Sequence, residues 1–171
     1  KQEYCCGMPK LELGDLKSVE KLKEKNIPIL VQAIKDGYDI VSPVPSCVLM
    51  FKQELPLLFP NDKDVILVQK NMFDPFEYLS LRDEEGLFNS NFKNTSGKIA
   101  YQTACHQRVQ NFGPKTKLIL SKIPESDITI IERCSGHDGT YAIKAESFEK
   151  SIKIRKPVVT KIKKDNYKVF T

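Results

Sequence analysis

Segments with the pattern of β-strands alternate along the chain with segments that have the pattern of helices. The expected strands, at 38–42, 98–103 and 127–131, are rich in β-branched and aromatic residues. The segments between them have apolar residues at the spacing of a helix. Such alternation is typical of α/β proteins, in which helices cover parallel strands. We therefore predict an α/β fold of two similar small lobes, 1–92 and 93–171, with mainly parallel strands.

Capping residues mark the expected helix boundaries. Asp15 and Asp74 are typical N-caps, each at the start of an expected helix. Gly37 ends the helix that begins at Asp15, and Gly86 ends the helix that begins at Asp74. Pro28 falls inside the first helix, where we expect a kink or a restart.

Three of the five cysteines follow the carboxyl ends of expected strands. Cys47, Cys105 and Cys134 lie a few residues beyond a strand, and parallel sheets bind ligands at this edge. Cys5 and Cys6 are adjacent, and neighbouring side chains in a strand point to opposite faces, so one core does not readily bury both. The cysteines are therefore candidates for a metal or redox site, with a buried small side chain as the alternative for Cys47.

The number and spacing of the cysteines narrow this chemistry. An odd number, with no secretion signal at the start of the chain, argues against a disulfide framework. The paired cysteine knuckles of structural zinc sites are missing, whereas clusters with several irons can bind adjacent thiolates. Cys105 lies beside His106, and Cys134 lies three residues before His137, so a cysteine nucleophile with a histidine base is a further alternative.

Composition excludes several classes of protein. The chain is 40% hydrophobic and 29% charged, as in globular proteins, and no apolar run approaches the ~20 residues of a membrane-spanning helix. Residues 144–168 hold nine basic side chains against three acidic ones. We interpret this segment as a solvated amphipathic helix, with docking to an acidic subunit or an anionic membrane surface as the alternative. No nucleic-acid reading motif accompanies the charge, so we expect no nucleic-acid binding.

The two ends of the chain resemble each other. Cys6 and Tyr38 are 32 positions apart, Cys134 and Tyr167 are 33 positions apart, and each interval holds a charged helical stretch with one proline. This similarity predicts an internal repeat.

Several strings of residues are similar to a known family. The strings CCGMP at 5–9, GYDIV at 37–41 and PSC at 45–47 resemble the cysteine-rich CCG domain of heterodisulfide reductase and its relatives. ACHQR at 104–108 and ERCSGHDGT at 132–140 resemble the form of this domain in the iron–sulfur subunit of anaerobic glycerol-3-phosphate dehydrogenase. Because the family has further cysteines beyond both ends, we interpret the chain as a fragment truncated at both ends.

The resemblance implies iron–sulfur chemistry. In the family each CCG domain contributes cysteines to a cluster, of the [4Fe–4S] type and in some members non-cubane. Cys5, Cys6 and Cys47 would bind one cluster and Cys105 and Cys134 the other, although a truncated chain is expected to hold incomplete sites. A ligand or loop hydrogen-bonding role is implied for His106 and His137.

The resemblance also implies which residues form the loops around the clusters. These residues are Gly7, Gly136, Gly139 and Arg133. The glycines are expected at turns with positive φ, where alanine would disturb cluster insertion more than folding.

The function implied by the resemblance is electron transfer. The chain would be a non-catalytic iron–sulfur component of a dehydrogenase complex in anaerobic respiration. Its partners would be a flavoprotein dehydrogenase subunit and a membrane-bound subunit that reduces quinone or a similar acceptor. It would be cytoplasmic and peripheral on the membrane, and a zinc-binding scaffold without redox activity is the alternative.

Overall fold

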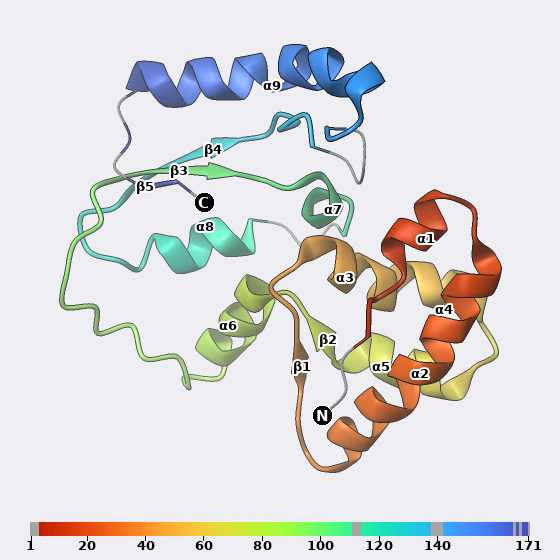
Figure 1. The fold of residues 1–171 in the computed structure, drawn as a ribbon. Coiled ribbons are helices and arrows are strands. Elements are labelled where there is room, and N and C mark those ends of the chain that lie inside the picture. Colours follow the sequence, from red (N-terminus) through yellow and green to blue (C-terminus); the bar gives the residue numbers. More distant parts are fainter. Residues whose placement is uncertain (1–3, 111–113, 138–141, 166, 168, 171) are drawn as a thin grey trace. The chain divides into compact units, whose positions relative to one another are not determined.

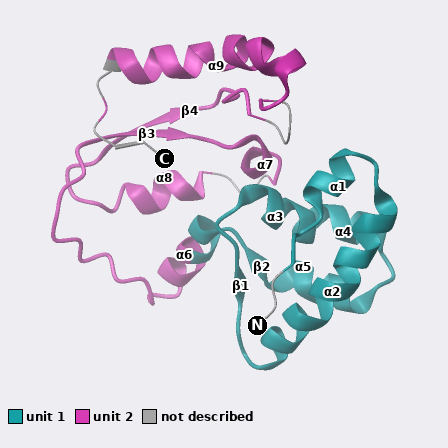
Figure 2. Cartoon of the chain, in the orientation of Figure 1, with its two compact units in different colours: residues 1–78 teal, residues 79–171 magenta. Residues whose placement is uncertain are grey.

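A computed structural model describes residues 4–110, 114–137, 142–165, 167 and 169–170. The chain divides into two compact units, unit 1 at Lys1–Tyr78 and unit 2 at Leu79–Thr171 (Figure 2). Both units combine parallel strands with helices, which confirms the predicted α/β class. The assignment of each lobe as a CCG unit stays a prediction.

Unit 1 is a helical unit around a short parallel sheet. Its elements are α1 (Met8–Glu12), α2 (Leu16–Lys35), β1 (Ile40–Val41), α3 (Pro45–Leu49), the π-helix η1 (Met50–Glu54), α4 (Leu55–Leu58), α5 (Lys63–Asn71) and β2 (Met72–Phe73). The α-helix α6 (Pro75–Glu84) crosses the boundary to unit 2. Strands β1 and β2 pair in parallel, with Ile40 opposite Met72. The core lies between α2, the helices from α3 to α5 and β2.

Helix α2 shows how local residues set its ends. The Asp15 side chain accepts a hydrogen bond from the Ser18 N–H, which caps the first turn. Gly37, at φ +89°, ends the helix, and the Tyr38 N–H donates to the Ala33 carbonyl, as in a Schellman motif. The expected restart at Pro28 does not occur, because α2 runs unbroken through it. The buried apolar stripe of α2 offsets the hydrogen bond that the proline removes.

Unit 2 contains a three-stranded parallel sheet in the order β4-β3-β5. Its elements after α6 are β3 (Lys98–Gln102), α7 (Cys105–Arg108), α8 (Lys115–Leu120), β4 (Asp127–Ile131), α9 (Ala145–Asp165) and β5 (Val169–Phe170). Figure 1 shows α9 on one side of this sheet and α8 on the other. Gln102 is opposite Ile131, so β3 and β4 end together.

The structure supports the internal repeat and corrects its register. Aligning Cys134 with Cys5, rather than with Cys6, gives a constant offset of 129 positions without a gap. With this offset α9 begins where α2 begins, and β5 coincides with β1. The matching residues are Gly7 with Gly136, Pro28 with Pro157, and Tyr38 with Tyr167.

Candidate metal centre

The fold of unit 1 brings two cysteines together that are 41 positions apart. The Sγ atoms of Cys6 and Cys47 are 3.2 Å apart and share a hydrogen bond. Cys6 immediately precedes the turn at Gly7 that starts α1, and Cys47 is the third residue of α3. Both thiols are half-buried and neither forms a disulfide. The structure thus places Cys47 beside the adjacent cysteine pair, in contact with Cys6, while a shared cluster at these cysteines stays a prediction.

The close approach changes how the two thiols ionise. A hydrogen bond from the Cys6 thiol stabilises the Cys47 thiolate and lowers the pKa of Cys47 to about 7. The same hydrogen bond, together with burial, raises the pKa of Cys6 above that of an ordinary cysteine. Near neutral pH the pair therefore loses one proton from Cys47 and keeps the other on Cys6. A thiolate, the form that binds metals, is available at this site without strong base.

Backbone contacts hold the first cysteines in place. The Asn26 side chain, on α2, donates a hydrogen bond of 3.0 Å to the Cys5 carbonyl, and Asn26 is only 8% exposed. Gly7 adopts φ +99°, which an L side chain rarely takes. Because the turn at Gly7 and the bond from Asn26 flank Cys6, they determine where its thiol lies. Asn26 was missed by sequence reasoning, although a polar residue in the apolar stripe of α2 is the signal that could have found it.

The dithiol fits a metal bound by thiolates. Two cysteine sulfurs on one tetrahedral zinc, at about 2.3 Å each, lie roughly 3.8 Å apart. Cys6 and Cys47 would need to separate by only about 0.6 Å from their present 3.2 Å to share one metal atom. Within the part of the chain that the structure describes, no three cysteine, histidine or acidic side chains form a group that could hold a metal ion. The structure thus places two candidate thiol ligands together, and their binding of a metal, with the exposed Cys5 as a third ligand, stays a prediction.

In unit 2 the two cysteines lie at one edge of the sheet. Cys105 begins α7, three positions after β3 ends, and Cys134 lies three positions after the end of β4. The paired ends of these strands bring both segments to the same edge. The Cys134 sulfur accepts a hydrogen bond of 3.3 Å from the Gly136 N–H, which ties the thiol to the following turn. That the two cysteines share a metal stays a prediction.

The loop at Gly136 is built around a close approach of two backbone segments. Gly136 has φ +75°, and the Ser151 hydroxyl on α9 donates a hydrogen bond of 2.6 Å to its carbonyl. A Cβ atom on Gly136 would lie 2.3 Å from the Ser151 carbonyl oxygen. Packing alone therefore requires glycine here, which differs from the expectation that alanine would affect folding less than cluster insertion. Gly139 lies outside the described residues.

A buried polar network anchors the short helix α7. The Tyr101 hydroxyl donates to the Gln107 side-chain oxygen, the Gln107 amide donates to the Thr116 hydroxyl at 3.3 Å, and that hydroxyl donates to Tyr101 at 3.2 Å. The three side chains come from β3, α7 and α8, and all are buried. The network fixes α7, and with it Cys105, on the sheet. Sequence reasoning noted Gln107 only as part of a motif and missed this role.

The remaining predicted residues surround these two cysteines. His106 is half-buried on α7, and its carbonyl accepts a hydrogen bond from the Gln110 amide at 2.7 Å. His137 and Arg133 are exposed in the loop that contains Cys134. The Arg133 carbonyl accepts a hydrogen bond from the Gln102 amide, which ties the loop to the end of β3. Their roles toward a metal stay predictions.

Three known proteins are similar to most of this chain. The chain is 25% identical over 167 residues to a subunit of anaerobic glycerol-3-phosphate dehydrogenase of Escherichia coli, an alignment that covers 94% of this chain and 40% of that protein. It is 28% identical over 152 residues to lactate utilization protein A of Oceanobacillus iheyensis, covering 83% and 58% of the two chains. It is 26% identical over 169 residues to a subunit of the fumarate reductase (CoM/CoB) of Methanothermobacter marburgensis, covering 95% and 31%.

The chain thus spans less than two thirds of the length of these relatives. No solved structure matches it. None of the described helices is long and apolar enough to cross a membrane. Residues 1–52 match the CCG family, which is described as a cysteine-rich domain, and this segment includes Cys5, Cys6 and Cys47. The resemblance to CCG cysteine-rich domain proteins that the sequence predicts is therefore confirmed.

Proposed function

We propose that the chain is part of an iron–sulfur electron-transfer subunit of a dehydrogenase complex associated with a membrane. The observation that carries this proposal is the thiol pair, because the fold of unit 1 brings Cys6 and Cys47 to 3.2 Å. A pair of half-buried thiols, one of them ionised near neutral pH, suits a soft metal centre better than a packed core. An iron–sulfur centre supplies one-electron chemistry without making or breaking bonds in a substrate.

The residues of unit 1 have distinct roles in this proposal. Cys6 and Cys47 would hold the metal as thiolates, with Cys5 as a further ligand. Asn26 fixes the backbone at Cys5, and the turn at Gly7 sets the direction in which the Cys6 thiol points. The half-buried position limits the access of water, which is one of the protein's means of tuning a redox potential.

In unit 2 we assign Cys105 and Cys134 to a second centre. Their common place at the carboxyl edge of β3 and β4 supports this assignment. His106 and His137 are in the same two segments and would act as further ligands or as hydrogen-bond donors to the sulfurs. The exposed Arg133 would add positive charge beside an anionic centre.

The names of two relatives support the partners that we propose. Two of the similar proteins are named as subunits of a dehydrogenase and of a fumarate reductase, so the chain would work within such a complex. We propose a flavoprotein subunit as electron donor and quinone, or a similar acceptor at a membrane-bound subunit, as the acceptor. The chain would lie on the cytoplasmic side of the membrane.

Reconstitution tests this proposal. The 171-residue chain would be incubated anaerobically with ferrous iron and sulfide, desalted, and analysed for iron, sulfide, zinc and visible absorbance. We expect iron and sulfide to bind with an oxygen-sensitive visible band, and Cys6→Ser and Cys47→Ser each to lose the iron held by unit 1. Ser46→Ala, beside Cys47, is the matched control and should keep the wild-type iron content.

Two results would contradict the proposal. Iron content that is unchanged in both Cys6→Ser and Cys47→Ser would remove these thiols from the site. A colourless protein that retains zinc and excludes iron under the same conditions would favour a zinc-binding scaffold instead.

A further inference from the structure

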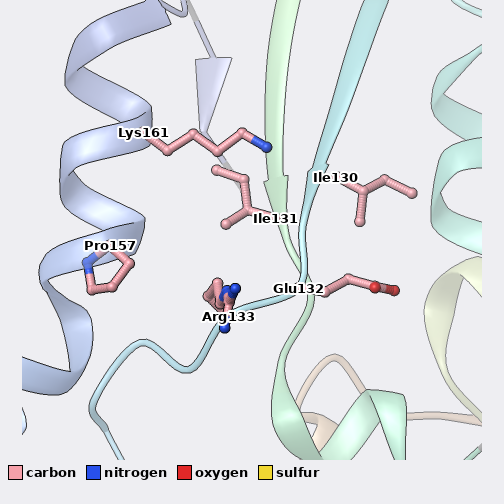
Figure 3. Close-up of a pocket in the computed structure, with 6 residues that line it drawn as sticks. All are labelled: Ile130, Ile131, Glu132, Arg133, Pro157 and Lys161. Atoms are coloured by element: carbon pink, nitrogen blue, oxygen red, sulfur yellow. The ribbon is translucent and has the colours of Figure 1, made fainter.

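A cavity of about 720 Å³ lies in unit 2 between β4 and α9, next to the loop that contains Cys134. Figure 3 shows its lining residues, which are Ile130, Ile131, Glu132, Arg133, Pro157 and Lys161. Four of the six are consecutive, so the cavity follows the chain from the end of β4 into the next loop.

The cavity runs along a free edge of the sheet. Of the strands that the structure describes, β4 pairs only with β3, and its other edge has no neighbour. In Figure 3 Ile130 and Glu132 point to one side of the strand, while Ile131 and Lys161 lie on the other. Successive side chains of a strand alternate between its two faces, and none of the lining residues comes from β3 or β5, so we place the cavity at the free edge of β4. Unpaired N–H and C=O groups at such an edge can pair with another extended chain.

The wall formed by α9 is strongly basic. Residues 150–164 contain seven basic side chains and no acidic one. A second cavity, of about 600 Å³, adjoins the first through Pro157 and Lys161 and is also lined by Lys153, Lys156 and Lys164. Among the described residues, no ion pair engages these lysines or the arginine of the first cavity. Glu132 is the one acidic side chain among the residues that line these two cavities, which we together call the groove, so the groove carries a net positive charge.

The internal repeat shows that the helix itself does not need these lysines. At the offset of 129, Lys153 of α9 corresponds to Glu24 of α2. Lys156 corresponds to the buried Ile27, and Lys161 corresponds to Gln32. Helix α2 forms at the same place around the same proline without this charge. Like charges three positions apart on a helix, such as Lys153 with Lys156, oppose folding slightly. The basic face is therefore best explained by what it binds.

We propose that the free edge of β4 binds an extended acidic segment of a partner protein, which adds to the sheet as a further strand. Its backbone would pair with β4, as in other peptides that bind by strand addition. Its acidic side chains would face Lys161 and the basic face of α9, and its alternate apolar side chains would face Ile130. Charge complementarity favours this occupant over a neutral or basic segment. The inference rests on β4 and α9 and not on any bound metal, so it can fail without affecting the proposed function.

Peptide binding to the 171-residue chain tests the inference. The probe is a fluorescein-labelled octapeptide of alternating glutamate and valine, (Glu-Val)₄, measured by fluorescence anisotropy at low and at physiological salt. We expect saturable binding that weakens with salt. Two further peptides, (Lys-Val)₄ and a (Glu-Val)₄ peptide with N-methyl groups at alternate backbone nitrogens, should bind at least tenfold more weakly.

Variants locate the site. The triple substitution Lys153→Glu, Lys156→Glu and Lys161→Glu should weaken (Glu-Val)₄ binding by roughly tenfold or more. This fold-change corresponds to the loss of three exposed charge pairs, each of which contributes about 0.5 kcal/mol to binding. Circular dichroism should show an unchanged helix content, since all three lysines are exposed.

The matched control makes the same change of charge on the other copy of the repeat. Lys17→Glu, Lys21→Glu and Lys35→Glu alter exposed positions of α2 and should leave binding within about twofold of wild type. Equal loss in the control and the α9 variant would overturn the inference, because the effect would then come from net charge. Equal binding of the N-methylated peptide would overturn strand addition. Binding to vesicles with anionic lipid, with no binding of (Glu-Val)₄, would overturn it in favour of a lipid surface.

Discussion

Replacing Gly136 by alanine should destabilise unit 2 far more than the same change at other glycines with positive φ. The alanine Cβ would lie 2.3 Å from the Ser151 carbonyl oxygen, a backbone atom that cannot rotate away. The loop or α9 must then move, and the hydrogen bond from the Ser151 hydroxyl to the Gly136 carbonyl is lost or strained.

The magnitude follows from two contributions. A left-handed conformation costs alanine about 1–2 kcal/mol, and the loss of a buried hydrogen bond costs about 1–1.5 kcal/mol. We expect about 3 kcal/mol less stability for Gly136→Ala. Gly86→Ala is the matched control: Gly86 has φ +72°, and its Cβ would meet no atom within 4 Å. This control should lose only the conformational contribution, about 1–2 kcal/mol.

Thermal unfolding followed by circular dichroism measures this difference, with hydrogen exchange of β4 and α9 to assign it to unit 2. For a unit of this size each kcal/mol lowers Tm by roughly 4–8 °C, so Gly136→Ala should lower it by roughly 12–24 °C. Gly7→Ala, whose Cβ would be 3.5 Å from the Met50 side chain in ordinary contact, should behave like Gly86→Ala. Equal Tm values for Gly136→Ala and Gly86→Ala would refute the close approach to Ser151.

Three further predictions concern the thiol pair and the network that holds α7. In the metal-free protein, the rate of alkylation of Cys47 by iodoacetamide should rise with pH through a midpoint near 7, because the Cys6 thiol lowers the pKa of Cys47 to about 7. Peptide mass spectrometry at each pH measures this rate, and a midpoint near pH ~8.5, which is usual for cysteine, would contradict the prediction. Oxidised glutathione should convert the two thiols to a Cys6–Cys47 disulfide and release two reduced glutathione molecules, which mass spectrometry of the unreduced digest detects; no such cross-link would contradict the 3.2 Å separation. Gln107→Ala should lower the free energy of unfolding by about 1–3 kcal/mol, because the hydroxyls of Tyr101 and Thr116 lose a buried hydrogen-bond partner. An unchanged free energy in urea unfolding would show that the network does not anchor α7.

Elements with local signals could be predicted from the sequence. The bounds of β4, Asp127–Ile131, were predicted correctly, because all four residues that follow Asp127 are β-branched. Asp15 and Gly37 mark the ends of α2 by direct hydrogen bonds and backbone conformation. Such signals depend only on neighbouring residues, so they can be recognised without the fold.

Elements that depend on distant partners could not be predicted in the same way. The apolar run Val-Ile-Leu-Val at 65–68 is, by itself, compatible with a buried strand or with the start of a helix. The structure shows that it belongs to helix α5, which Asp62 caps by accepting a hydrogen bond from the Val65 N–H. The two-residue strand β2 was not predicted, since only its pairing with β1 makes it a strand. The π-helix η1, in the middle of a helical run, also has no signal that a local pattern would show.

The same distinction applies to the site. The resemblance to the CCG domain implied that Cys47 would share a centre with Cys5 and Cys6, and the structure places its thiol 3.2 Å from that of Cys6. Which thiol it meets depends on the turn at Gly7 and on the contact from Asn26 to the backbone of Cys5. The contact from Asn26 joins parts of the chain 21 positions apart, and no local pattern contains it.

A redox titration of the reconstituted chain, followed by electron paramagnetic resonance, tests most directly whether the Cys6 and Cys47 thiols hold an electron-transfer centre. The Cys134→Ser variant would serve as background, so that unit 2 does not contribute a signal. We expect a reversible one-electron signal in this background that is retained with Ser46→Ala and lost with Cys47→Ser. A signal of the same intensity with Cys47→Ser, or no paramagnetic species at any potential, would contradict an electron-transfer centre at these thiols.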